Sequence, residues 1–159
     1  MNHCTSSSCS VVNAGEYAAG ARIRSCKNVV CDNMIFNGNN AQNTEAFGLL
    51  LDSCDSVTVT NSIVKSNVSF NELGIGFSAV DVKTFSLNNC EASNNSYSGV
   101  LVDNSNVVVK YSNLLSNGLY GVKDNVGVPT NIYLENVAVG NLTDNLSIGG
   151  ATSVGNIVV

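Results

Sequence analysis

Two aspartates, Asp52 and Asp103, are the residues of this 159-residue chain whose type and spacing come nearest to catalytic chemistry. Each stands four residues after a glycine that opens an apolar segment, Gly48 or Gly99. If these segments stack as rungs of a repeat, the two carboxylates lie two rungs apart, or about 9.6 Å at the usual strand spacing. That separation is at the wide edge of the range for inverting glycoside hydrolases, in which one carboxyl acts as acid and the other as base.

Arg24 occupies the same position one repeat earlier, where it can form a structural ion pair with Asp52. Aspartate is also a common turn residue at strand ends. The two aspartates and Arg24 are therefore candidate catalytic residues, but a structural role explains them as well, and we favour the structural interpretation.

Other catalytic and metal-binding patterns are missing from the sequence. His3 is the only histidine and falls in a polar column of the repeat, so no histidine-based triad or metal cluster is expected. The six cysteines include no C-x-x-C pair, and we predict neither a metal nor a cofactor. Cys26 and Cys54 share one column on successive rungs, where a disulfide is geometrically possible but is not required.

The elements that must position these residues form a repeat of 22 to 28 residues. Each copy opens with two apolar positions separated by one residue and then usually has Asn. The alternation has the period of a strand, and one copy is too small to bury its own apolar face, so the copies must stack around a continuous core. The copies begin at Cys4, Val29, Val57, Phe85, Val107, Ile132 and Ile157.

The columns of the repeat predict which side chains face the core. In the sixth copy Ile132, Leu134, Val137 and Val139 are expected to point inward, which leaves Tyr133 outside. Tyr111 interrupts a column of asparagines that predicts a bend, because Asn tolerates left-handed backbone. The outward polar columns, with Tyr111 and Tyr133 as candidate ligand-binding residues, suit contact with a carbohydrate or a protein. The asparagines of the bend column are Asn33, Asn61, Asn89 and Asn136.

Coils such as Asn28-Val29-Val30-Cys31-Asp32-Asn33-Met34 and Asn131-Ile132-Tyr133-Leu134-Glu135-Asn136-Val137 resemble the right-handed parallel β-helix, or pectin-lyase-like, repeat family. The resemblance covers almost the whole chain and implies a single all-β domain over residues 1–159, a right-handed parallel β-helix of about six coils. That family contains polysaccharide lyases, hydrolases and epimerases, tailspikes and adhesins, so the fold does not fix the function. The segment Arg22-Ile23-Arg24 is similar to the Arg-Ile-Lys segment of polygalacturonases, but the Asn-Thr-Asp, Asp-Asp and Gly-His-Gly elements of those enzymes are missing.

The composition limits which classes of partner the protein can be expected to bind and in which cell compartment it is expected to be made. The net charge of −5 argues against nucleic acid, and no apolar run is long enough to span a membrane. No signal peptide is visible, and the cysteines read as reduced, which favours cytoplasmic synthesis. Neither end carries an amphipathic cap, so the chain is expected to be a fragment of a longer rod or to self-associate end to end or side by side.

These observations predict a non-catalytic β-helix scaffold or binding module that contacts a polysaccharide. One alternative is a polysaccharide hydrolase, lyase or epimerase, or a fragment of one, that uses Asp52 and Asp103. Another is a structural subunit of a larger particle or a surface fibre.

Overall fold

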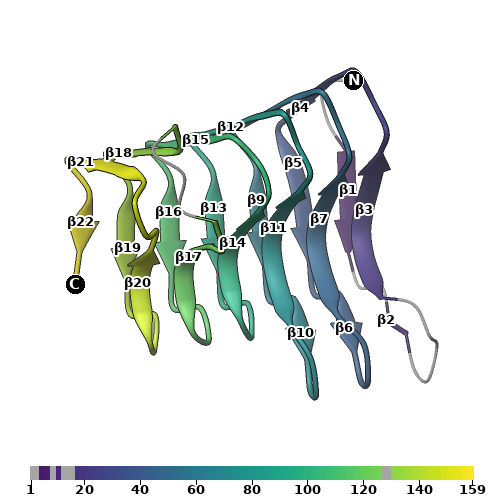
Figure 1. Ribbon diagram of the computed structural model, residues 1–159. Coiled ribbons are helices and arrows are strands. Elements are labelled where there is room, and N and C mark those ends of the chain that lie inside the picture. The colour runs from purple at the N-terminus through teal and green to yellow at the C-terminus, as the bar shows by residue number, and fades with distance from the viewer. Residues whose placement is uncertain (1–3, 8–9, 12–16, 127–129) are drawn as a thin grey trace.

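The computed structural model describes residues 4–7, 10–11, 17–126 and 130–159, which form an all-β parallel solenoid (Figure 1). In each turn the chain passes through a front, a top and a back sheet, named for their places in Figure 1, and neighbouring strands in each sheet are parallel. The front and top sheets each have six strands, so the chain makes about five complete turns, close to the six coils expected. No α-helix occurs among the described residues, and hence none that could cross a membrane.

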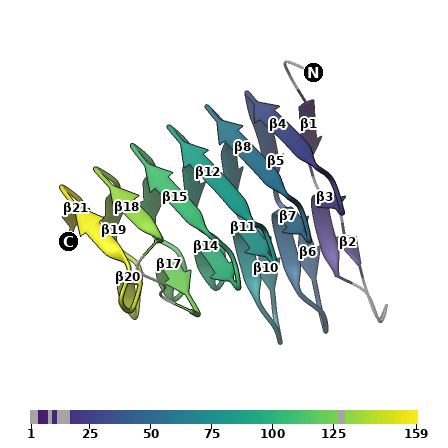
Figure 2. The same ribbon diagram turned by 45° about the horizontal axis from the view of Figure 1, so that its top comes forward.

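The strands of the front sheet are β3 (Ala18–Arg24), β7 (Ala46–Asp52), β11 (Gly74–Val80), β14 (Ser98–Asp103), β17 (Tyr120–Asp124) and β20 (Asp144–Ser147). Those of the top sheet, which comes forward in Figure 2, are β4 (Asn28–Asp32), β8 (Ser56–Thr60), β12 (Thr84–Asn88), β15 (Val107–Lys110), β18 (Ile132–Leu134) and β21 (Thr152–Val154). Those of the back sheet are β1 (Cys4–Ser7), β5 (Met34–Asn37), β9 (Ile63–Lys65), β13 (Glu91–Ser93), β16 (Asn113–Leu115), β19 (Val137–Val139) and β22 (Ile157–Val158). A small sheet of β2 (Ser10–Val11), β6 (Asn40–Ala41) and β10 (Val68–Ser69) links the back and front sheets in the first turns.

The core is a column of aliphatic and aromatic side chains that runs through the turns. Phe36, Phe77 and Phe85 are fully buried within it, together with Leu49 and Leu87. These residues come from all three main sheets, so each rung covers the apolar face of the next. The predicted stacking of copies around one core is confirmed.

Left-handed residues mark the corners between the sheets. At the corner between top and back sheets the positive φ angles fall at Asn33, Asn61, Asn89, Tyr111 and Glu135. The predicted bend is therefore confirmed at four of its positions, including Tyr111, and in the sixth copy it falls on Glu135 instead of Asn136. Short polar side chains tolerate this backbone best, which explains why Asn recurs there.

A buried ladder of asparagines runs along the solenoid axis, in the segments that connect the back sheet to the front sheet. Asn67 Nδ2 donates to Asn95 Oδ1 at 2.8 Å, and the backbone N–H of Asn67 donates to the same oxygen at 3.1 Å. The pattern repeats along the axis through Asn39, Asn67, Asn95, Asn117 and Asn141. Opposite the ladder stand glycines, and a Cβ added at Gly48 would lie 2.9 Å from Val64 Cβ and 3.0 Å from Asn67 Nδ2. The same Cβ would lie 2.8 Å from the carbonyl oxygen of Gly76, so the glycine column is required by the backbone of the next rung as well as by the asparagine ladder.

The sixth rung has a different register from the one predicted. Tyr133, not Leu134, pairs with Val109, and Ala138 pairs with Leu114, so Tyr133 and Ala138 are the fully buried side chains. The expectation that Ile132, Leu134, Val137 and Val139 face inward was wrong, because a shift of one residue moves every side chain of a strand to the other face.

The last rung also departs from the predicted alignment. Ile157 pairs with Val137 in the back sheet, whereas the top-sheet strand of this rung begins earlier, at Thr152. The final turn is shorter than the others, which moves Ile157 out of the column where the sequence placed it. His3 and Cys9 lie outside the described residues.

Candidate functional site

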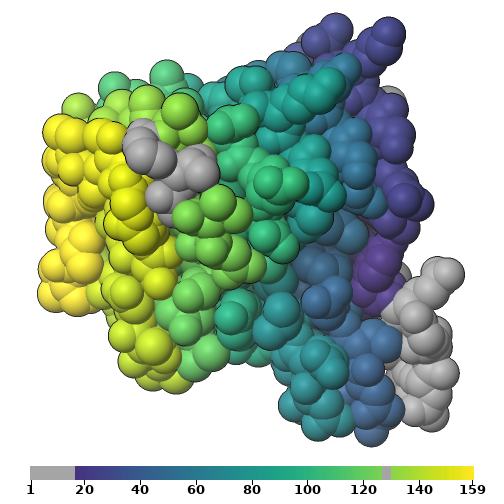
Figure 3. Space-filling view, in the orientation of Figure 1, coloured from purple at the N-terminus to yellow at the C-terminus, as the bar shows by residue number. Residues whose placement is uncertain are grey.

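A groove of about 370 Å³ lies on the outer face of the front sheet, over the middle of β7, β11 and β14. This is the face seen in Figure 3, above the loops of β6 and β10, which project below the sheets in Figure 1. Tyr17, Glu45 and Leu73 line one end of the groove, and Asp52, Asp103 and Asn125 line the other. The groove therefore follows the direction of the strands.

The floor of the groove is apolar although it lies outside the solenoid core. Phe47 and Leu50 of β7 are 4% and 6% exposed, and they pack with Ile75 of β11 in a cluster separate from the main core. Partly buried Leu101 and Val80 join the same cluster and line the groove. The front sheet is thus covered by apolar side chains on both of its faces in this region.

A signal for this floor was present in the sequence. Leu49, Leu50 and Leu51 form a continuous apolar run, which is typical of a strand buried on both faces. A simple alternation of inward and outward residues does not predict the outer cluster, because it leaves Leu50 without an apolar partner.

Ser78 supplies a buried hydroxyl to the groove. Its side chain is fully buried, and its neighbours in register are Leu50 on β7 and Leu101 on β14. Ser78 is one of the residues that line the groove, and its Oγ is buried and has no hydrogen-bond partner. Buried polar groups are almost always paired, so a hydroxyl without a partner at the base of a groove is a reason to expect a ligand there.

Asp52 lies at the groove's upper end, where two arginines and a serine hold it. Arg22 Nη2 and Arg24 Nε lie 2.8 and 3.1 Å from Asp52 Oδ2, and Ser53 Oγ donates to Oδ1 at 2.6 Å. The hydrogen bond from Ser53, followed by that from Arg22, lowers the pKa of Asp52. The ion pair with Arg24 that the sequence suggested is present, and Asp52 is a stable carboxylate rather than a proton donor.

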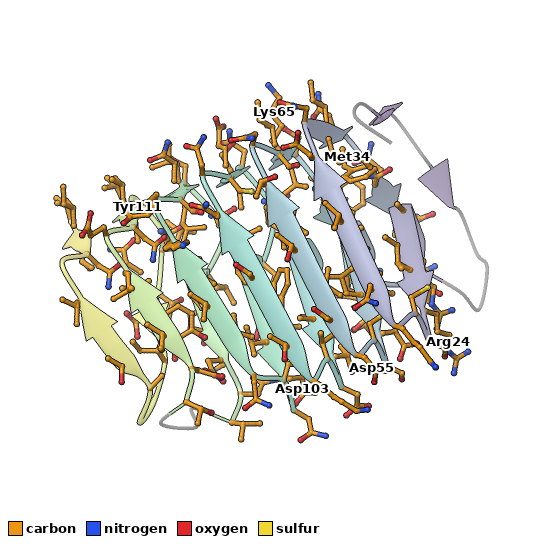
Figure 4. The ribbon with its side chains drawn as sticks, turned by 90° about the horizontal axis from the view of Figure 1, so that it is seen from above. Arg24, Met34, Asp55, Lys65, Asp103 and Tyr111 are labelled. Carbon is orange, nitrogen blue, oxygen red and sulfur yellow. The ribbon has the colours of Figure 1, made fainter. Side chains whose placement is uncertain are left out.

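Asp103 lies two rungs from Asp52, with Val80 of β11 paired to both. The predicted spacing of the two aspartates is therefore present, at about two strand separations, or 9.6 Å. Val80 lies between them because Gly76 of β11 aligns with Gly48 of β7. Figure 4 shows Arg24 and Asp103 along the same edge of the solenoid.

Glu45 is the ionisable group of the groove's lower end. Burial, and then the neighbouring charge of Glu72, raise the pKa of Glu45. One carboxyl with a raised pKa and one with a lowered pKa in the same cleft is a pattern of acid–base pairs. Glu45 and Asp52, however, lie at opposite ends of β7, about 23 Å apart along an extended strand, which is too far for them to act on one bond.

The two candidate tyrosines lie apart from the groove and from each other. Tyr111 is 52% exposed at the corner between the top and back sheets, on the edge opposite Asp103 in Figure 4, with Lys110 Nζ 5.9 Å from its ring centroid. Tyr133 is fully buried, and its hydroxyl donates to Asp124 Oδ2 at 2.9 Å. The outward placement of Tyr133 was wrong, and with it the role of this residue as a surface ligand contact.

The cysteines form no bridge among the described residues. Cys26 and Cys54 are not bridged to each other, and both are free, as is Cys90. The described residues also contain no cluster of three or more His, Cys, Asp or Glu side chains arranged to hold a metal ion. The chemistry of the groove therefore rests on carboxylates, one hydroxyl and apolar surface.

Comparisons with protein-family models, with curated proteins and with solved structures found no match for this chain. The geometry of the groove is accordingly the basis for assigning a function.

Proposed function

We propose that this protein is a non-catalytic binding module that holds a polysaccharide chain in the groove of its front sheet. The observation that carries the proposal is the buried, unpartnered hydroxyl of Ser78 at the base of an apolar groove. Ligand sites combine apolar walls with a few polar groups that fix orientation. A sugar ring offers both aliphatic C–H faces for Leu50 and Leu101 and hydroxyls for Ser78.

The state of Asp52 supports binding over catalysis. Hydrolysis by an inverting pair needs one carboxyl that donates a proton and another that activates water. Asp52 is held as a carboxylate by Arg22, Arg24 and Ser53, and Val80 separates it from Asp103. The ion pair explains Arg24 as a structural residue. The proposal includes two finer points about the fold. The chain is a member of the pectin-lyase-like family, and its solenoid is right-handed.

A direct test is to titrate the protein with a panel of neutral, acidic and basic oligosaccharides by calorimetry, alongside the Ser78→Ala variant. Removal of an unpartnered buried hydroxyl leaves the free protein as stable as before or slightly more stable. In the complex the variant lacks one hydrogen bond, so we expect an affinity about three- to tenfold lower.

The matched control is Thr58→Ala, which removes a hydroxyl from the outer side of the top sheet, away from the groove. It should bind as the parent does. Product analysis of the same mixtures tests the enzyme alternative: depolymerisation that Asp52→Asn abolishes would contradict a non-catalytic module. The absence of binding to every oligosaccharide in the panel would contradict the proposed function itself.

A further inference from the structure

The charged groups among the described lining residues are all carboxylates. The described lining residues include Glu45, Asp52 and Asp103, and none of the described lining residues is Lys, Arg or His. Arg22 and Arg24 of β3 both contact Asp52, and the guanidinium of Arg22 also lies 5.1 Å from the ring centroid of Tyr17. These two cations offset the charge of Asp52, which leaves Glu45 and Asp103 as the other carboxylates of the described lining. An acidic ligand such as a polyuronate would therefore meet carboxylates of like charge.

Another cation, Lys123 of β17, contacts side chains that are not among the described lining residues. Lys123 is the neighbour of Leu101 in register, but its Nζ lies 4.9 Å from the ring centroid of Tyr120 and donates to Ser147 Oγ at 3.4 Å. The ammonium of Lys123 therefore interacts with side chains of β17 and β20, the two strands beyond β14. The negative charge of the groove is thus not balanced from that side.

The lower end of the groove brings two carboxylates together. Glu45 is half-buried where the loop joins β7, and the pairing of Ala46 with Gly74 places Glu72 in the adjacent loop of the next rung. The charge of Glu72 there adds to the effect of burial in raising the pKa of Glu45. An ammonium group placed beside Glu45 would offset both the like-charge repulsion and the loss of solvation. This end is therefore suited to a cationic group.

Ser78 provides the second, independent indication of a ligand. Its paired residue, Leu50, lies five residues beyond Glu45, or about 16 Å along the strand, and Asp103 is paired two residues beyond Ser78. One ligand that reaches the carboxylates and the buried hydroxyl must be linear and several sugar units long.

The backbone beneath the groove argues against an extended peptide in this site. β7, β11 and β14 are each hydrogen-bonded to a strand on both sides, so a peptide lying over them could form no main-chain ladder. A glycan needs no such ladder, because its contacts are hydroxyls and C–H faces.

We infer, on the basis of the proposed function, that the groove selects a linear glycan with free amino groups. An ammonium of that glycan pairs with Glu45 beside Glu72, and a hydroxyl pairs with Ser78. The groove disfavours polyuronates through the carboxylates of Glu45 and Asp103.

The experiment compares four probes by calorimetry at low salt: a glucosamine hexamer, its fully N-acetylated form, a galacturonate hexamer and a lysine hexamer. The pH is set so that both the ammonium groups and the groove carboxylates are charged. We expect the glucosamine hexamer to bind about tenfold more tightly than the acetylated form, with an affinity that falls as salt is added. The galacturonate hexamer should bind most weakly of the oligosaccharides.

Glu45→Gln should reduce the affinity for the glucosamine hexamer about tenfold and leave that for the acetylated hexamer unchanged. The control Glu135→Gln removes the same charge from an exposed corner outside the groove, and should change neither affinity. Equal affinities for both hexamers, or tighter binding of galacturonate, would overturn the amine inference and leave the proposed function standing. Equal binding of the lysine hexamer with the same Glu45 dependence would overturn the glycan as the occupant. No binding of any sugar would overturn both proposals.

Discussion

The hydroxyl of Tyr133 donates to Asp124 Oδ2 at 2.9 Å inside the solenoid, where Tyr133 is fully buried and Asp124 is 6% exposed. Asn131 Nδ2 donates to the same oxygen at 2.8 Å, and the backbone N–H of Val126 donates to Oδ1 at 3.1 Å. Burial, and then the charge of Asp124, raise the pKa of Tyr133, so the phenol stays protonated as a donor. The network joins β17 to β18 and fixes the register of the sixth rung.

We therefore predict that Tyr133→Phe destabilises the fold by about 1–3 kcal/mol, because it removes one donor from a buried carboxylate. Urea unfolding gives the change in free energy. Tyr111→Phe is the matched control, and should stay within about 0.5 kcal/mol because Tyr111 is exposed at a corner. Equal stability of both variants would show that the register of this rung does not depend on the phenol.

The asparagine ladder gives a second prediction. Asn95 Oδ1 accepts from the backbone N–H and Nδ2 of Asn67, while Asn95 Nδ2 donates to Asn117 Oδ1 at 2.9 Å. Asn95→Ala leaves these buried groups without their partner, and we expect a cost of about 1–3 kcal/mol for each group affected. Thermal and urea unfolding both report the loss.

The chain provides a matched control for that variant. Asn71 Nδ2 donates to Asn43 Oδ1 at 2.8 Å on exposed loops, which is the same bond as in the ladder but in water. Asn71→Ala should change the free energy of unfolding by no more than about 0.5 kcal/mol. A loss for Asn71→Ala as large as that for Asn95→Ala would mean that burial is not what makes the ladder stabilising.

The architecture could be predicted from the sequence because each copy repeats the same alternation, and only stacking buries it. The register of the sixth copy could not, because Ile132, Tyr133 and Leu134 are all apolar and any of them can face a core. The choice is made by Asp124, nine residues earlier, whose carboxylate needs the hydroxyl of Tyr133. The two-rung spacing of the aspartates was predicted correctly, but the groove whose upper end they line depends on outward leucines that a simple alternation assigns to solvent.

The cysteines should differ sharply in reactivity in the folded protein. Burial raises the pKa of the Cys90 thiol to about 11, whereas Cys26 is partly exposed. The thiolate is the reactive species, so alkylation at about pH 8 should label Cys26 first, and Cys90 only after unfolding. Mass mapping of peptides with and without urea gives the comparison. Labelling of Cys90 as fast as Cys26 without urea would contradict the burial of Cys90, which is 3% exposed.

Glu45 should make stability depend on pH in a definite direction. Its folded pKa lies above its ordinary value of 4.5, so between these two values the folded state binds more protons than the unfolded state. Stability therefore falls as the pH rises through that interval and stays lower above it. Glu45→Gln should remove this loss and gain stability over the parent as the pH rises past 4.5, measured by urea unfolding from about pH 4 to 7. An unchanged pH profile, matching that of Glu135→Gln, would contradict the burial of Glu45.

The last rung should make the isolated chain associate with itself. Val154, Ile157 and Val159 are 56%, 56% and 78% exposed there, beside strand edges of β21 and β22 that have a neighbour on only one side. Exposed parallel edges and apolar side chains favour stacking of a further rung, which a second copy can provide. We expect sedimentation velocity to show mass increasing with concentration, and Val154→Lys with Ile157→Lys to suppress the increase. Val30→Lys, at an equally exposed valine on the side of the rod, should leave it unchanged. A clean monomer at high concentration would contradict end-to-end association and leave the last rung stable without a partner.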